Sequence, residues 1–87
     1  MNSDEIKIRD DRTIRANVLV SLEKFSWVSG NLINVVVLDE VVQLWGVITE
    51  ESQRKNILGA AERTVGVIAV EDHLMLVQPT AFAALMP

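Results

Sequence analysis

Two apolar runs separated by two acidic residues form the most regular pattern in the chain. Residues 32–38 and 41–48 are both rich in β-branched side chains, and Asp39 and Glu40 lie between them. Runs of this length and composition, joined by a two-residue polar break, are typical of an antiparallel hairpin. The pattern therefore predicts a hairpin against which the remainder of the chain packs.

Alternation within the hairpin assigns its side chains to two faces. One face carries an uncharged set suited to a helix-covered core: Ile33, Val35, Val37, Val42, Leu44, Gly46 and Ile48. The opposite face is interrupted mainly by Asn34 and Gln43, and its apolar residues are Val36, Leu38, Val41, Trp45 and Val47. A face open to water is usually more polar than this. We therefore expect the second face to have a cover or a binding role.

Helical periodicity flanks the hairpin on both sides. Before it, Asp10 or Asp11 is an N-cap candidate, and apolar residues then recur at spacings of four, four and three, which predicts a helix over residues 11–25. These residues are Ile14, Val18, Leu22 and Phe25. After the hairpin, Thr49 is a good N-cap for a second helix that ends near Gly66. The buried stripe expected for this helix is Ile57, Leu58, Ala61 and Val65.

The last apolar run, residues 67–77, predicts a third strand with Val70, Leu74 and Leu76 on one face. The resulting order is αββαβ, an α+β fold with two helices packed on one face of a three-stranded sheet. We expect a mixed sheet, because a helical crossover usually joins parallel strands whereas the hairpin is antiparallel. The pattern leaves open which hairpin strand the third strand joins. Residues 1–10 are interpreted as a flexible lead, residues 11–78 as the domain and residues 79–87 as a tail.

Composition limits the function. The 87 residues include twelve acidic and eight basic side chains, a net charge of −4 that opposes attraction to nucleic acid and to anionic lipid. Cysteine is absent, so the chain has no thiol nucleophile and no thiolate zinc site. The N-terminus lacks a signal-peptide core, and no apolar run reaches membrane-spanning length. We expect a soluble cytoplasmic chain, or a periplasmic one if a signal peptide has been removed.

The sequence displays little that could carry out catalysis. His73 is the single histidine, and in a strand it shares a side with Glu71 but not with Asp72, which makes a poor metal site. The acidic pairs at 10–11 and 50–51 lie where helix starts explain them. The chain has neither a glycine-rich phosphate loop nor a serine nucleophile motif. We therefore predict no catalytic residue, metal or cofactor, and no enzyme activity.

Several spaced residues resemble the BON domain, a small αββαβ module of bacterial envelope and osmotic-stress proteins. The resemblance covers about residues 11–77. It rests on Asp11-x-x-Ile14 with Val18 and Leu22, on Val35-x-Val37-x-Asp39-x-Val41-Val42-x-Leu44-x-Gly46, and on Ala61, Val65-Gly66-Val67 and Leu74. Glu40 departs from the family pattern, which usually has glycine in the hairpin turn. A residue other than glycine at positive φ is strained, so this departure leaves the turn type open.

A narrower similarity concerns BON domains that follow a pair of CBS domains in bacterial proteins. It is carried by Trp27-Val28, Leu44-Trp45-Gly46 and Glu71-Asp72-His73-Leu74. This resemblance implies a regulatory, C-terminal interaction module of a larger cytoplasmic protein. The wider family implies an alternative, a phospholipid-binding domain of an envelope or stress-response protein.

Three interpretations of the apolar second face follow. The tail around Phe82 could cover it or leave it modestly exposed; a protein, either a second copy or the neighbouring CBS domains, could bind it; or phospholipid could bind it. Protein contact is favoured, since tryptophan is enriched at protein interfaces and the acidic charge opposes lipid. The candidate contact residues are Trp27, Val36, Leu38, Val41, Trp45, Val47 and Phe82.

Overall fold

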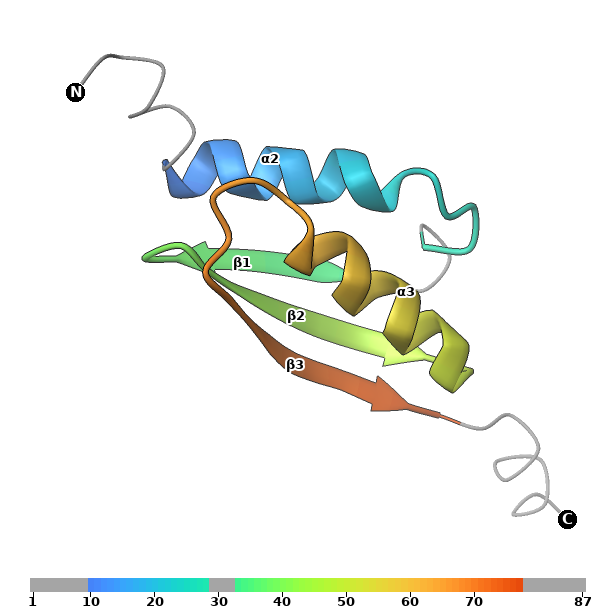
Figure 1. Cartoon of the computed structure of the whole chain (residues 1–87). Helices are drawn as coiled ribbons and strands as arrows, with labels where there is room; N and C mark the ends of the chain where they lie inside the picture. Colours follow the sequence, from blue (N-terminus) through green and yellow to red (C-terminus); the bar gives the residue numbers. More distant parts are fainter. Residues whose placement is uncertain (1–9, 29–32, 78–87) are drawn as a thin grey trace, which may run out of the picture.

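The computed structural model describes residues 10–28 and 33–77, which form a layer of two helices on a layer of three strands (Figure 1). In chain order the elements are α2 (Asp11–Leu22), β1 (Asn34–Leu38), β2 (Val41–Ile48), α3 (Glu51–Glu62) and β3 (Ala69–Leu76). The predicted αββαβ order and α+β class are confirmed. The predicted tail, including Phe82, lies outside the described residues.

The sheet has the order β1-β2-β3, which makes β2 its central strand. β1 pairs with β2 antiparallel, in a register that places Val35 opposite Leu44. β3 pairs with β2 in parallel, in a register that places His73 beside Trp45. The mixed sheet is confirmed, and the partner of the third strand, which the sequence left open, is β2.

The core lies between the sheet and the two helices. Leu44 on the central strand is fully buried, as its parity predicts, and Ile14, Val18 and Leu22 form the buried stripe of α2. α2 begins at the N-cap Asp10, whose side chain accepts a hydrogen bond from the backbone N–H of Arg12 at 2.8 Å. The hydrophobic side chains buried in this layer are Ile14, Val18, Leu22, Val35, Val37, Val42, Leu44, Ile48, Ile57, Ala60, Ala61 and Leu74.

Both helices are shorter than the sequence predicts. α2 ends at Leu22, so Phe25 follows the helix and is half-buried. α3 ends at Glu62, and Val65, expected in its buried stripe, is 66% exposed. α3 ends early because of Thr64. Its N–H donates to the Ala61 carbonyl at 3.2 Å, and its hydroxyl donates to the Ala60 carbonyl at 2.9 Å. These bonds tighten and close the last turn of the helix, leaving Val65 beyond it.

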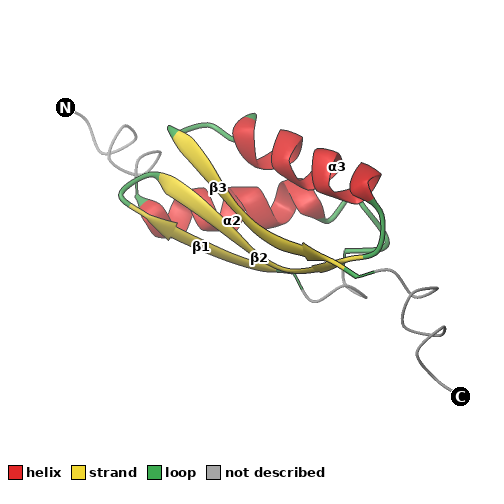
Figure 2. Ribbon diagram, turned by 90° about the horizontal axis from the view of Figure 1, so that it is seen from below, coloured by secondary structure: helices red, strands yellow, loops and turns green. Residues whose placement is uncertain are grey.

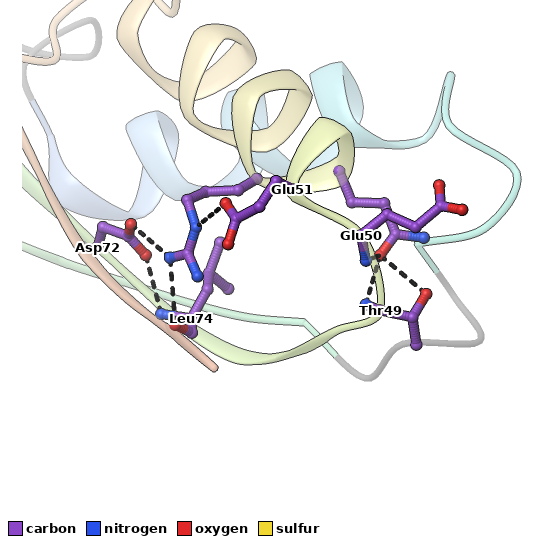
Figure 3. Close-up of polar contacts among 7 residues, drawn as sticks. Thr49, Glu50, Glu51, Asp72 and Leu74 are labelled. Carbon is purple, nitrogen blue, oxygen red and sulfur yellow. Dashed lines mark hydrogen bonds and ion pairs between the residues drawn. The ribbon is translucent and has the colours of Figure 1, made fainter. Parts of the chain in front are cut away.

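The start of α3 also differs by one residue from the prediction. Its N-cap is Glu50 and not Thr49. The side-chain oxygen of Gln53 accepts the backbone N–H of Thr49 at 2.8 Å and that of Glu50 at 3.3 Å. This glutamine therefore satisfies donors ahead of the helix, as in a capping box (Figure 3).

The hairpin turn is held from outside the hairpin. Asp39 and Glu40 have φ angles of 51° and 67°, the left-handed conformation that a type I′ turn requires. The carboxylate of Asp11, in the first turn of α2, accepts the N–H of Asp39 at 2.9 Å and the N–H of Glu40 at 3.0 Å. This side chain thus stabilises a turn whose two central residues are not glycine.

Candidate interaction surface on the outer sheet face

The face of the sheet turned away from the helices is uncovered in the described part of the molecule (Figure 2). We call it the outer face. Strand register assigns to it Asn34, Val36, Leu38, Val41, Gln43, Trp45, Val47, Ala69, Glu71, His73 and Met75. Exposed apolar side chains come from all three strands, including Leu38 at 57%, Trp45 at 44% and Met75 at 65%. The outer face is therefore largely apolar, with Gln43 and Glu71 forming a polar row between its two ends.

A stacked pair of rings lies on the two longer strands of this face. The indole of Trp45 and the imidazole of His73 are nearly parallel, with ring centroids 4.0 Å apart and an interplanar angle of 8°. The parallel register of β2 and β3 makes these residues direct neighbours. Such stacking contributes beyond the area that it buries. It fixes the large indole in one place, so the surface that Trp45 offers is preorganised.

The polar atoms around this pair have partners on the same face. Trp45 Nε1 donates to Gln43 Oε1 at 3.4 Å, and His73 Nε2 lies 3.2 Å from Glu71 Oε1. Within the outer face as defined, Glu71 is the one carboxylate, and the set contains neither lysine nor arginine. The surface is therefore close to neutral on a chain whose net charge is −4.

At each edge of the sheet, an arginine from a helix bonds one backbone carbonyl. Arg15 on α2 donates to the carbonyl of Val35 on β1 at 2.8 Å. Arg54 on α3 donates to the carbonyl of Leu74 on β3 at 3.2 Å and to Asp72 Oδ2 at 2.6 Å (Figure 3). Asp72 Oδ1 in turn accepts the N–H of Leu74 at 2.9 Å. These side chains occupy backbone groups that an added strand would need.

The same contacts shift two pKa values. Hydrogen bonds to Glu51 and then to Asp72 raise the pKa of the Arg54 guanidinium, so it stays charged. Burial acts to raise the pKa of Asp72, but hydrogen bonds from the Leu74 N–H and from Arg54 outweigh it and hold that pKa below its usual value. Because the Leu74 N–H and the Arg54 guanidinium both stabilise the ionised Asp72 carboxylate, the Arg54–Asp72 pair persists at neutral pH.

A hollow of about 610 Å³ continues the outer face around the free edge of β1. Trp45 and Val36 line it from the outer face, and Arg15 from α2. Its other lining residues are Asn34, Val35 and Val37. A partner that covers Trp45 would therefore also reach this edge.

The structure brings together most of the residues that the sequence singles out, but not all. Val36, Leu38, Val41, Trp45 and Val47 lie on the outer face. Trp27 does not: it is half-buried, packs against the core and stacks on Phe25 with centroids 5.4 Å apart. Phe82 lies outside the described residues.

The contribution of β3 to the outer face was missed at the sequence level. His73 and Met75 lie there because β3 joins β2 in parallel, a pairing that the sequence did not decide. One signal was available: Glu71, His73 and Met75 have the opposite parity to Val70, Leu74 and Leu76, which the sequence predicts on one face. That parity places these three residues on the outer face once the strand partner is known.

Two further features of the described residues bear on the kind of site present. Within residues 10–28 and 33–77, three or more His, Asp or Glu side chains nowhere gather in a way that could hold a metal ion. In the same part of the chain, no helix has the length and apolarity needed to cross a bilayer. What the outer face offers is an apolar surface with a fixed aromatic pair.

Comparison with known proteins identifies the family. No curated protein is significantly similar to the chain. The family model described as the BON domain matches residues 10–78, which include every helix and strand of the structure. The match confirms the resemblance carried by the spaced residues of α2, the hairpin and β3. The chain therefore belongs to the BON domain family.

Proposed function

We propose that this BON domain is a non-catalytic interaction module that uses its outer face to bind protein. BON domains are binding modules, so the open question is what binds and where. The observation that carries the proposal is the apolar outer face, on which Trp45 is 44% exposed while held in a stack with His73. Exposed apolar surface of this kind, with tryptophan at its centre, is typical of protein interfaces.

Phospholipid is the alternative, and the charge of the outer face favours protein over it. Recognition of anionic lipid depends on clustered lysine and arginine near the contact surface. The outer face has Glu71 as its formal charge, and Arg15 and Arg54 are engaged at the two sheet edges. A protein surface of low charge fits the outer face better.

The proposal extends to the setting of the domain. We place it as the regulatory C-terminal module of a cytoplasmic bacterial protein that carries a pair of CBS domains. Support comes from Trp27-Val28, Leu44-Trp45-Gly46 and Glu71-Asp72-His73-Leu74, which resemble the BON domains of such proteins. Two of these segments meet at the Trp45–His73 stack, so the proposed contact residues coincide with that narrower similarity.

Site-specific photocrosslinking tests the proposal. A photoreactive amino acid is placed at Val47 on the outer face or at Val20, a valine on α2 that is 63% exposed. In any protein that carries the domain, we expect the yield of crosslinks to polypeptide to be severalfold higher from Val47 than from Val20. Equal yields at the two positions would contradict it. Binding to anionic vesicles at low salt that is released at high salt, and lost in Trp45→Ala, would favour lipid instead.

A further inference from the structure

We infer that the partner of the outer face is a second copy of this chain, packed sheet to sheet about a two-fold axis. This inference rests on the proposed function, and it adds both the identity of the partner and the geometry of the contact. Three observations support it: the bonds at the sheet edges, the distribution of charge, and the complementary polar groups of the face. The size of the face limits how tight the contact can be.

The edges direct association to the face. Two copies of an open sheet can join either by pairing edge strands or by stacking faces. Arg15 holds the Val35 carbonyl on β1, while Arg54 and Asp72 hold the carbonyl and N–H of Leu74 on β3. Edge pairing would displace these bonds on either side of the sheet. Stacking leaves all of them in place.

The charge distribution directs two acidic copies to the same face. A net charge of −4 opposes the association of two copies wherever their carboxylates face one another. Carboxylates lie at the hairpin turn, with Asp11, Asp39 and Glu40, and on or near α3, with Glu51 and Glu62. The outer face carries only Glu71, which is beside His73. Two copies that meet through this face each bring one carboxylate to the contact.

The polar groups of the face are complementary to themselves. In a two-fold contact, a residue i that meets residue j of the other copy is matched by j meeting i. The outer face holds an acceptor, Glu71, and two side chains with donor atoms, His73 and Gln43. A second copy can therefore present donors to the Glu71 carboxylate while its own carboxylate receives them in return.

Sheet geometry sets the size of the contact. Three strands about 4.8 Å apart and about 26 Å long give the outer face a footprint of roughly 350 Å². A standard interface buries about 800 Å² on each partner, so this is a small contact. We expect reversible pairing with a dissociation constant between about 10 μM and 1 mM. In the pair the two sheets lie about 10 Å apart and the helices form the outermost layers.

Sedimentation equilibrium of the 87-residue chain tests the inference. The weight-average mass should rise from 9.7 kDa at about 5 μM toward twice that value at about 1 mM. Val47→Glu would bury a carboxylate on each side of the axis and should weaken pairing at least about tenfold. Val20→Glu, the same change on exposed α2, should alter it by less than about twofold. Leu38→Glu is a second outer-face variant, should Val47→Glu fold poorly.

A monomeric mass up to about 1 mM, or equal effects of Val47→Glu and Val20→Glu, would overturn the inference. Photocrosslinking at Val47 in a mixture of ¹⁴N- and ¹⁵N-labelled chains separates this failure from failure of the proposed function. Crosslinked peptides with mixed labels, both from the outer face, support self-pairing. Crosslinks to another protein, with a monomeric chain, overturn self-pairing but leave the proposed function intact. A crosslinking yield at Val47 no higher than that at Val20 overturns both self-pairing and the proposed function.

Discussion

The carboxylate of Asp11 accepts the backbone N–H of Glu40 at 3.0 Å, although 29 residues separate the two along the chain. Through this bond the first turn of α2 holds the hairpin turn in register. The bond matters because Glu40 has φ 67°, a backbone conformation that is strained for any residue with a Cβ.

Glu40→Gly should therefore stabilise the domain. The left-handed conformation costs a residue with a Cβ about 1–2 kcal/mol, and the greater freedom of unfolded glycine offsets about 0.5–1 kcal/mol of the relief. We expect the free energy of unfolding to rise by up to about 1 kcal/mol, measured by urea denaturation. Glu50→Gly is the comparison: Glu50 has φ −144° and no strain to release, so this change should lower stability through backbone freedom and the loss of the side chain at the helix N-cap. Equal effects of the two changes would contradict strain at Glu40.

Leu44 and Leu38 lie on neighbouring strands and face opposite sides of the sheet. Leu44 is fully buried and Leu38 is 57% exposed. We expect Leu44→Ala to lower the free energy of unfolding by about 2–5 kcal/mol, because it leaves a cavity in the core. Leu38→Ala should cost about 0.5 kcal/mol or less in the monomer. Urea denaturation at low protein concentration compares the two variants. If Leu44→Ala cost no more stability than Leu38→Ala, the inner and outer faces of the sheet would be wrongly assigned.

Much of this fold follows from local patterns. The two faces of the hairpin were predictable because parity is fixed once a strand is recognised, and Leu44 and Trp45 followed from it. The ends of α3 were not, because they depend on which side chains bond the terminal backbone groups, here Gln53 and Thr64. The Trp45–His73 stack was not predicted, since the sequence left open which hairpin strand β3 joins. Such long-range pairing leaves no local signal in the chain.

The Arg54–Asp72 pair makes stability depend on pH. The folded-state pKa of Asp72 lies below its usual value, so its charged form stabilises the fold above about pH 4, near the pKa of an unfolded aspartate. That stability is lost as the pH falls through the folded-state pKa. We expect the wild-type chain to lose more stability between about pH 5 and pH 2 than Asp72→Asn does. The measurement is the urea midpoint at each pH.

The control for this prediction is Glu71→Gln. Glu71 is adjacent in sequence but on the opposite face, away from Arg54. The contrast between Asp72→Asn and Glu71→Gln isolates the ion pair at the edge of β3 from the general protonation of carboxylates. If the two variants kept the same pH dependence, Asp72 would have no special part in it.

The last prediction concerns the interface role of Trp45. Its ring contacts His73 and not the core, so Trp45→Ala should lower the monomer's free energy of unfolding by no more than about 1–1.5 kcal/mol. If the outer face is an interface with Trp45 as its hot spot, the same change should weaken self-association by about 2 kcal/mol or more, roughly thirtyfold. Sedimentation equilibrium and urea denaturation of one sample measure both quantities.

A chain ending at Gln78 tests whether residues 79–87 are the cover instead. In that case truncation, and not Trp45→Ala, would increase the binding of a hydrophobic dye. Association unchanged by Trp45→Ala would leave this tryptophan as ordinary surface and remove the central contact from the proposed interface.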